Sequence, residues 1–207
     1  LSLAPGTNRV RIHNTNTGIV THAILEVPEP GQAAASATQI PGVMGAWPGV
    51  LLALLDPAGA KTGSLFPTGK RLDRIDEIEV SCVDLAVPMV IVRAGDLGKT
   101  ARETPAALDA DGEFKERLRR IWVAAGLRMG LKRRDGAPMG EAELAASETI
   151  PKICIIAEPD VEEAARGAHI RVRYFTPQAA HKSLAVTGGA CLAAACLVPG
   201  TLAHGIA

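Results

Sequence analysis

Aromatic residues are scarce in this chain of 207 residues, at 3% of the sequence, and neither sign of charge dominates among 22 basic and 22 acidic residues. A nucleic-acid surface needs clustered positive charge and stacking rings, and the sequence has neither. Its apolar runs near residues 50–55 and 190–198 are too short to cross a bilayer, and no secretory signal is visible. We therefore expect neither a nucleic acid nor a membrane as a partner.

The sequence also lacks paired cysteines. Its four cysteines form no C-x-x-C pair and have no histidine at zinc spacing; they are Cys82, Cys154, Cys191 and Cys196. Each lies in an apolar run, so we expect reduced thiols in a cytoplasmic protein, without disulfides or a metal site. No Ser-His-Asp order, catalytic carboxylate pair or HExxH motif is present, so the residues alone do not define a reaction.

Hydrophobic patterning predicts an α+β fold. Alternation and β-branched content predict strands at residues 9–13, 19–27, 78–83, 88–92, 152–157 and 170–175. The apolar run at 50–55 is either a buried strand or the start of one. Residues 111–130 form an amphipathic helix in this interpretation, with Phe114, Leu118, Ile121 and Ala125 on the apolar face. Strand and helix do not alternate regularly, which argues against a doubly wound sheet.

The apolar run at residues 190–198 predicts a second helix, which is apolar on every face and ends before Pro199. A helix without a polar face is expected to be buried all round, so strands would curl around it. Thr187, Gly188 and Gly189 precede it, and their bare N–H groups at a helix start suit a carboxylate or phosphate. With His181 and Lys182 in the loop before them, a small-anion pocket is predicted. The alternative is an ordinary core helix with a glycine-rich start.

A glycine-rich segment at residues 59–69 offers weaker candidates. It lacks the spacing of a phosphate-binding loop, although Lys61 and Thr62 could reach a substrate. A purely structural loop is the alternative. Asp84, between two predicted strands, is either a proton acceptor or the cap of a turn. The chain starts at Leu1 and stops soon after the second helix, so we expect it to be part of a longer protein.

Eight stretches occur in an order that resembles the PrpF family of polycarboxylate isomerases, which includes 2-methylaconitate isomerase and 4-oxalomesaconate tautomerase. They are residues 10–17, 54–59, 65–69, 80–84, 92–98, 125–130, 150–152 and 181–201. The resemblance implies the diaminopimelate epimerase fold, in which two similar domains each wrap a strand-rich sheet around a central helix. Residues 1–207 would then be most of the second domain, with the first domain largely absent.

By the same resemblance, the protein would be an isomerase that moves a double bond by a 1,3-proton shift, with no metal or organic cofactor. The catalytic lysine and cysteine of the family belong to the first domain and would lie outside this chain. The residues here would bind a polycarboxylate substrate. The backbone of Thr187, Gly188 and Gly189 would hold one carboxylate and His181 a second. Further substrate-binding candidates are Lys182, Lys61, Thr62 and Thr68.

Two departures from the family pattern leave other functions open. Related epimerases place a second cysteine at the start of the central helix, where this chain has Ala185 and Val186. Val87 stands where relatives often have a polar, asparagine-type residue. One rival is a non-catalytic homologue that binds a carboxylate metabolite or assists a partner enzyme. Another is an amino- or hydroxy-acid racemase, which would need the missing thiol. The identity of the polycarboxylate and the formation of a homodimer also stay open.

Overall fold

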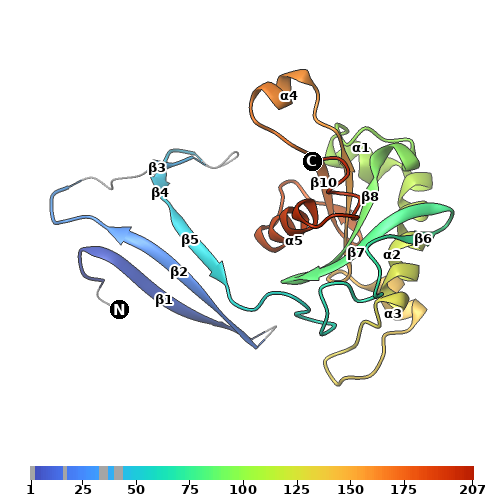
Figure 1. Cartoon of the computed structure of the whole chain (residues 1–207), viewed down its shortest axis with the longest axis horizontal. Helices are drawn as coiled ribbons and strands as arrows, with labels where there is room; N and C mark the ends of the chain where they lie inside the picture. Colours follow the sequence, from blue (N-terminus) through green and yellow to red (C-terminus); the bar gives the residue numbers. More distant parts are fainter. Residues whose placement is uncertain (1–2, 16–17, 33–36, 40–43) are drawn as a thin grey trace. The chain divides into compact units, whose positions relative to one another are not determined.

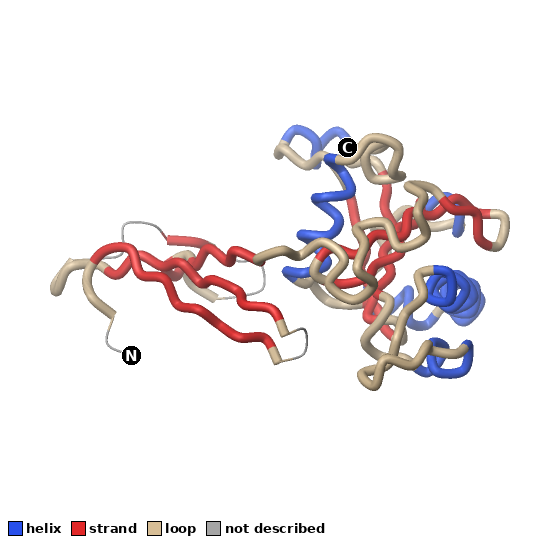
Figure 2. Tube along the Cα trace, turned by 60° about the horizontal axis from the view of Figure 1, so that its bottom comes forward, coloured by secondary structure: helices blue, strands red, loops and turns tan. Residues whose placement is uncertain are grey.

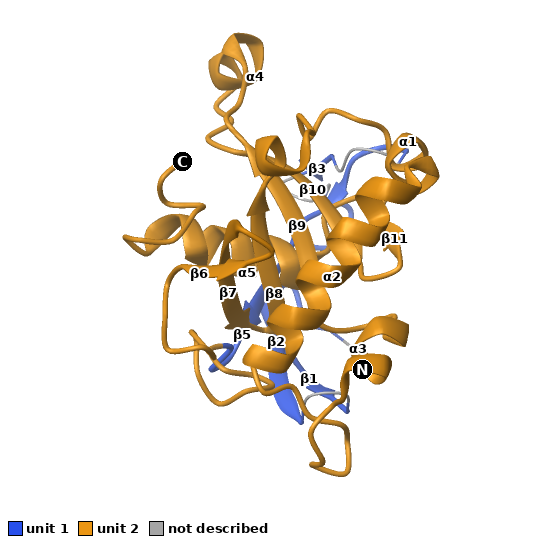
Figure 3. Cartoon of the chain, turned by 90° about the vertical axis from the view of Figure 1, so that its right-hand side faces the viewer, with its two compact units in different colours: residues 1–57 blue, residues 58–207 orange. Residues whose placement is uncertain are grey.

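The chain forms two compact units, residues 1–57 and residues 58–207, in a computed structural model that describes residues 3–15, 18–32, 37–39 and 44–207 (Figures 1 and 3). The contacts separate a small first unit from a larger second one. The assignment of these residues to the second domain of a longer protein stays a prediction.

The first unit contains a three-stranded antiparallel sheet in the order β1-β2-β5 (Figure 2). Its strands are β1 Gly6–Asn14, β2 Ile19–Val27 and β5 Val50–Leu54, and a short pair joins β3 Ala37–Thr38 to β4 Trp47–Pro48. The two predicted strands are confirmed, and residues 16–17 of the turn between them lie outside the described residues. The apolar run at 50–55 is a strand but not a buried one, because Leu51 is 66% exposed.

The second unit is built on a six-stranded sheet in the order β11-β10-β9-β8-β7-β6. Its strands are β6 Asp73–Ile75, β7 Ile78–Leu85, β8 Val87–Arg93, β9 Lys152–Ala157, β10 Arg171–Thr176 and β11 Ala179–Ala180. All neighbours are antiparallel except β8 and β9, which run parallel with Met89 beside Lys152. The four predicted central strands are confirmed, and the two short outer strands, β6 and β11, were not predicted.

The predicted amphipathic helix covers one face of this sheet as α2, Gly112–Arg128 (Figure 3). The Asp111 carboxylate caps it by accepting from the Phe114 N–H at 3.0 Å. Phe114, Leu118 and Ile121 are all buried, as the spacing predicted, and they pack against apolar residues of β7, β8 and β9. Three short helices complete the second unit: α1 Pro105–Ala110, α3 Glu141–Ala146 and α4 Val161–Ala165.

The apolar helix packs against the opposite face of the sheet as α5, Val186–Leu197. Its buried residues are Gly188, Cys191, Leu192 and Ala195, which meet side chains of β7, β8, β9 and β10. It begins at Val186 rather than near residue 190. The helix was also expected to be buried on every face, and this is not what the described residues show. The second unit, described by itself, offers α5 one sheet face, with Val186 63% exposed and Leu197 81% exposed.

The outer side of α5 forms part of an apolar groove of about 410 Å³ together with Ile170 and Val172. Among the described residues, no helix is both long enough and apolar enough to span a membrane. All four cysteines are free thiols, with Cys82, Cys154 and Cys191 buried and Cys196 half-buried. The prediction that the thiols are reduced and lie in apolar surroundings therefore agrees with the structure.

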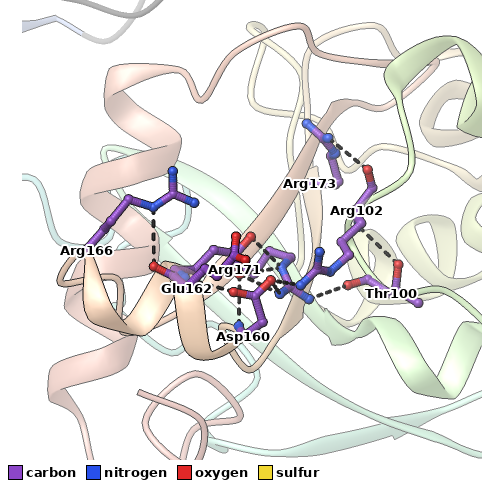
Figure 4. A network of polar contacts seen from close by, with 8 residues as sticks. Thr100, Arg102, Asp160, Glu162, Arg166, Arg171 and Arg173 are labelled. Carbon is purple, nitrogen blue, oxygen red and sulfur yellow. Dashed lines mark hydrogen bonds and ion pairs between the residues drawn. The ribbon is translucent and has the colours of Figure 1, made fainter.

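An ion-pair network ties α4 to β10 and to the loop after β8 (Figure 4). The Arg171 guanidinium binds the carboxylates of Glu163 and Asp160 and also donates to the Thr100 carbonyl at 3.2 Å. Arg102 pairs with Asp160 as well. A polar pocket of about 400 Å³ lies beside these residues, but Arg102 and Arg171 are already paired with carboxylates. The network therefore holds the loop around residues 100–102 against α4 and β10.

We expect Glu163→Gln to lower stability at neutral pH and to have little effect in acid. The hydrogen bond from Arg171 lowers the pKa of the Glu163 carboxyl below its ordinary value. A carboxyl with a lowered pKa stabilises the fold above about pH 4.3, its usual pKa, and this contribution is lost as pH falls through the folded-state pKa. The Gln side chain can still accept from the Asp160 N–H, so the substitution tests the charge.

Thermal unfolding of Glu163→Gln and wild type at pH 7 and at pH 3 measures this effect. Glu162→Gln is the control, because Glu162 is exposed in the same helix. An equal difference between Glu163→Gln and wild type at both pH values would contradict the assignment.

Candidate functional site

The first turn of α5 presents backbone donors without a cap. Ala185 occupies the N-cap position in extended conformation (φ −64°, ψ 144°), and no side chain caps the turn. The Gly189 N–H already donates to the Ala185 carbonyl at 2.8 Å. The N–H groups left without an intrahelical acceptor are thus those of Val186, Thr187 and Gly188. Sequence reasoning placed the donors at 187–189, one residue too late, because it started the helix too late.

Tyr174 is the residue of this site that sequence reasoning missed. Its side chain is 3% exposed, and its buried hydroxyl has no hydrogen-bond partner among the described residues. The ring lies against the first turn of α5: a Cβ added to Gly188 would stand 2.4 Å from Tyr174 Cε2 and 3.0 Å from its hydroxyl oxygen. Gly188 therefore lets a buried hydroxyl reach the N-terminus of the helix. The available signal was that Tyr174 is the only tyrosine in the chain, on a predicted strand.

His181 follows β11 directly, and the pairing of β10 with β11 in a hairpin places it beside Tyr174. Its N–H donates to the Tyr174 carbonyl at 2.8 Å, and the two rings meet edge to face with centroids 5.9 Å apart. The His181 Nδ1 accepts from the Ser183 N–H at 3.1 Å, so in the neutral ring the proton sits on Nε2. Nε2 is then a donor suited to a carboxylate. Lys182 is exposed and makes no hydrogen bond or ion pair within the described part of the chain.

Asp84 organises the glycine-rich loop at the end of β7. Its side chain is fully buried, and Oδ2 accepts from the Lys61 N–H at 2.9 Å, the Thr62 N–H at 2.8 Å and the Thr62 hydroxyl at 2.8 Å. Next to it, the Val83 carbonyl accepts from the Cys191 thiol of α5 at 3.7 Å. Asp84 thus holds Lys61 and Thr62 at the strand end that contacts α5. Of the two predicted roles, the geometry matches the turn cap.

Thr68 is placed elsewhere. Its hydroxyl donates at 2.6 Å to the carboxylate of Asp73 in β6, the edge strand of the sheet. The structure brings His181, Thr187 and Gly188 together around Tyr174, and holds Lys61 and Thr62 at the neighbouring end of β7. It does not bring Thr68 to this group, and a role for Thr68 in substrate binding stays a prediction.

The thiols near the site do not act as bases. Burial raises the pKa of Cys191 to about 12 and raises the pKa of Cys154 well above its ordinary value. Both therefore stay protonated at neutral pH, which agrees with the prediction that Cys191 is a buried residue. Within the described ranges, no group of three or more His, Cys, Asp or Glu side chains is arranged to hold a metal ion. The site offers hydrogen-bond donors to an anion.

Comparison with known proteins gives a consistent result. YbhH of Escherichia coli (strain K12) is 38% identical over 198 residues, covering 96% of this chain and 52% of that protein. The 4-oxalomesaconate tautomerase of Pseudomonas putida is 36% identical over 96% of this chain and 50% of that protein. The crystal structure of methylitaconate-delta-isomerase is similar with a TM-score of 0.82 and 29% sequence identity. The match covers 100% of this chain and 55% of the isomerase chain.

The chain therefore spans about half the length of the curated relatives it matches. The mixed α+β architecture is shared with an isomerase of known structure. The family model described as PrpF protein matches residues 2–207, and with the relatives above it establishes that this chain belongs to the PrpF family.

Proposed function

We propose that the protein is a cofactor-independent isomerase that shifts a double bond by 1,3-proton transfer in an unsaturated di- or tricarboxylate. Candidate substrates are 2-methylaconitate, aconitate and 4-oxalomesaconate. Relatives named as a tautomerase and as isomerases of such acids support the substrate class. The observation that carries the proposal is the uncapped first turn of α5 with the buried Tyr174 hydroxyl beside it.

The chemistry requires a place for negative charge. When a base removes a proton from a carbon next to a carboxyl or keto group, charge moves onto the oxygen atoms of that group. Donors fixed before the reaction stabilise this charge without having to reorganise. The N–H groups of Val186, Thr187 and Gly188, the helix dipole and the His181 Nε2–H would supply such donors. The lysine and cysteine that move the proton are expected in the remainder of the longer protein.

The proposal extends to the architecture. In the longer protein, further strands would cover the exposed side of α5 and complete the wrapping expected for the epimerase-like fold. The apolar groove along α5 and the exposure of Leu197 support this arrangement. A small polycarboxylate is the expected partner of the site.

We expect His181→Ala to weaken substrate binding about fivefold to tenfold, the loss of one charge-assisted hydrogen bond, without unfolding the protein. Within the described residues, the His181 ring forms hydrogen bonds with Ser183 in the same loop, and the backbone bond to Tyr174 stays in the variant, so the sheet is expected to remain intact. Steady-state kinetics of the full-length enzyme would show the loss. His204→Ala is the control, because its ring contacts the Cys196 carbonyl at the C-terminal end of α5, away from the first turn. Wild-type affinity and turnover in His181→Ala would refute the role.

Proton NMR of the full-length protein in D₂O tests the reaction itself. Each candidate acid is added in turn, and the spectra report deuterium entering an allylic carbon together with a shifted double bond. That result would establish the isomerase and its substrate class. A folded protein that exchanges no proton in any of these acids would contradict the proposal.

A further inference from the structure

Lys152 is the first residue of β9, at the end of the sheet where α5 starts. Lys152 pairs in register with Met89 of β8, and two residues further along the strand Cys154 pairs with Tyr174 of β10. Side chains alternate along a strand, and Cys154 and Ile156 belong to the core beneath α5. Lys152 therefore shares the α5 face of the sheet.

Contacts across the sheet place the first turn of α5 at the same end. Gly188 packs on the Tyr174 ring, and the Cys191 thiol donates to the Val83 carbonyl. Val83 pairs with Met89, and Met89 pairs with Lys152. Val83, Met89 and Lys152 are therefore neighbours on adjacent strands, and Val83 lies under the first half of α5.

The Lys152 ammonium lacks a counterion within the described part of the chain. It makes no hydrogen bond or ion pair there, although its side chain is half-buried. Burial lowers its pKa from the ordinary lysine value, and no neighbouring charge offsets this. The Lys152 Nζ is not fully buried, so the ammonium is open to an incoming anion while the stem of the side chain packs in the fold.

We propose that Lys152 binds a second carboxylate of the substrate whose first carboxylate lies at the first turn of α5. The buried Tyr174 hydroxyl, also without a partner among the described residues, points independently to a ligand at that turn. Lys152 then sets specificity, because an acid with one carboxylate cannot use both the turn and the ammonium. This inference rests on the proposed function and names the residue that selects polycarboxylates.

The test uses the full-length protein and tricarballylate, a saturated tricarboxylate that cannot be isomerised. Lys152→Met should weaken its binding on the order of tenfold, as expected for one charge-assisted contact. Lys152→Arg keeps the charge and should bind within about threefold of wild type. Lys132→Met, at an exposed position, is the matched control and should bind like wild type. Binding of butyrate, with one carboxylate, should be the same in all four proteins.

Two further readouts separate binding from folding. Because Met keeps the apolar stem of the side chain and the ammonium has no counterion to lose, Lys152→Met should unfold at a temperature close to that of wild type. With an isomerisable substrate, Lys152→Met should raise KM and leave kcat nearly unchanged. Tricarballylate affinity equal to wild type in Lys152→Met, or equally weak binding by Lys152→Arg, would overturn the inference.

The outcomes for the reaction and for Lys152 are distinguishable. Loss of tricarballylate binding in Lys152→Met, with no isomerisation of any acid by wild type, would refute the proposed reaction and keep the Lys152 site. Isomerisation by Lys152→Met at the wild-type KM would refute the Lys152 site and keep the reaction.

Discussion

A Gly188→Ala variant is expected to lose about 2 kcal/mol of unfolding free energy, although alanine is normally the better helix former. The added Cβ would stand 2.4 Å from Tyr174 Cε2 and 2.7 Å from Cζ. The ring is buried and has His181 at its edge, so it cannot move aside without opening that contact. The same displacement would remove the Tyr174 hydroxyl from the first turn, and substrate binding should fall with stability.

Gly189→Ala is the control for this prediction. Its added Cβ would be 3.4 Å from Leu184 Cδ2, an ordinary contact, and the position lies in the same helix. Here the usual advantage of alanine over glycine, about 0.5–1 kcal/mol, should appear. Urea denaturation of the two variants measures the difference. If Gly188→Ala were as stable as Gly189→Ala, the packing of Tyr174 on the helix start would be wrong.

Asp84→Ala should be destabilised on the order of 2–3 kcal/mol. The substitution removes three part-buried hydrogen bonds at once, from the N–H groups of Lys61 and Thr62 and from the Thr62 hydroxyl. Each such bond to a charged acceptor contributes on the order of 1 kcal/mol. The glycine-rich loop should detach from the end of β7, so proteolysis within residues 59–69 should become faster. Denaturation and limited proteolysis measure the two effects.

Two controls interpret the Asp84 result. Asp84→Asn keeps an acceptor oxygen at the same place and should retain most of the stability. Asp96→Ala removes an exposed carboxylate and should be neutral. If Asp84→Ala were as stable as Asp96→Ala, the carboxylate would not be holding the loop.

Local signals determined what could be predicted. The helix over residues 111–130 was found because its apolar spacing lies in the segment itself. The start of α5 was placed too late because Thr187, Gly188 and Gly189 are weak helix formers. In the structure, Gly188 is inside the first turn since only glycine leaves room for Tyr174. That reason involves a strand residue fourteen positions away, and no local pattern carries it.

The burial of α5 illustrates a second limit. The sequence shows that its faces are apolar, and this is correct, but it does not show what covers them. Within the second unit one sheet face covers α5, and Val186 and Leu197 are exposed. The roles of Asp84 and Lys152 depend on which strands are neighbours, and register decides that. His181 was chosen as a candidate because a histidine next to a glycine-rich helix start is a local feature.

The central claim is that a substrate carboxylate binds at the first turn of α5, and amide NMR of the full-length protein tests it most directly. With valine, threonine and glycine labelled with ¹⁵N, the signals of Val186, Thr187 and Gly188 can be followed during titration with tricarballylate. We predict that all three shift and saturate together. The signal of Gly112, at the start of α2 where Asp111 already caps the helix, should not move. Unchanged signals at the three α5 residues, or equal shifts at Gly112, would contradict the account.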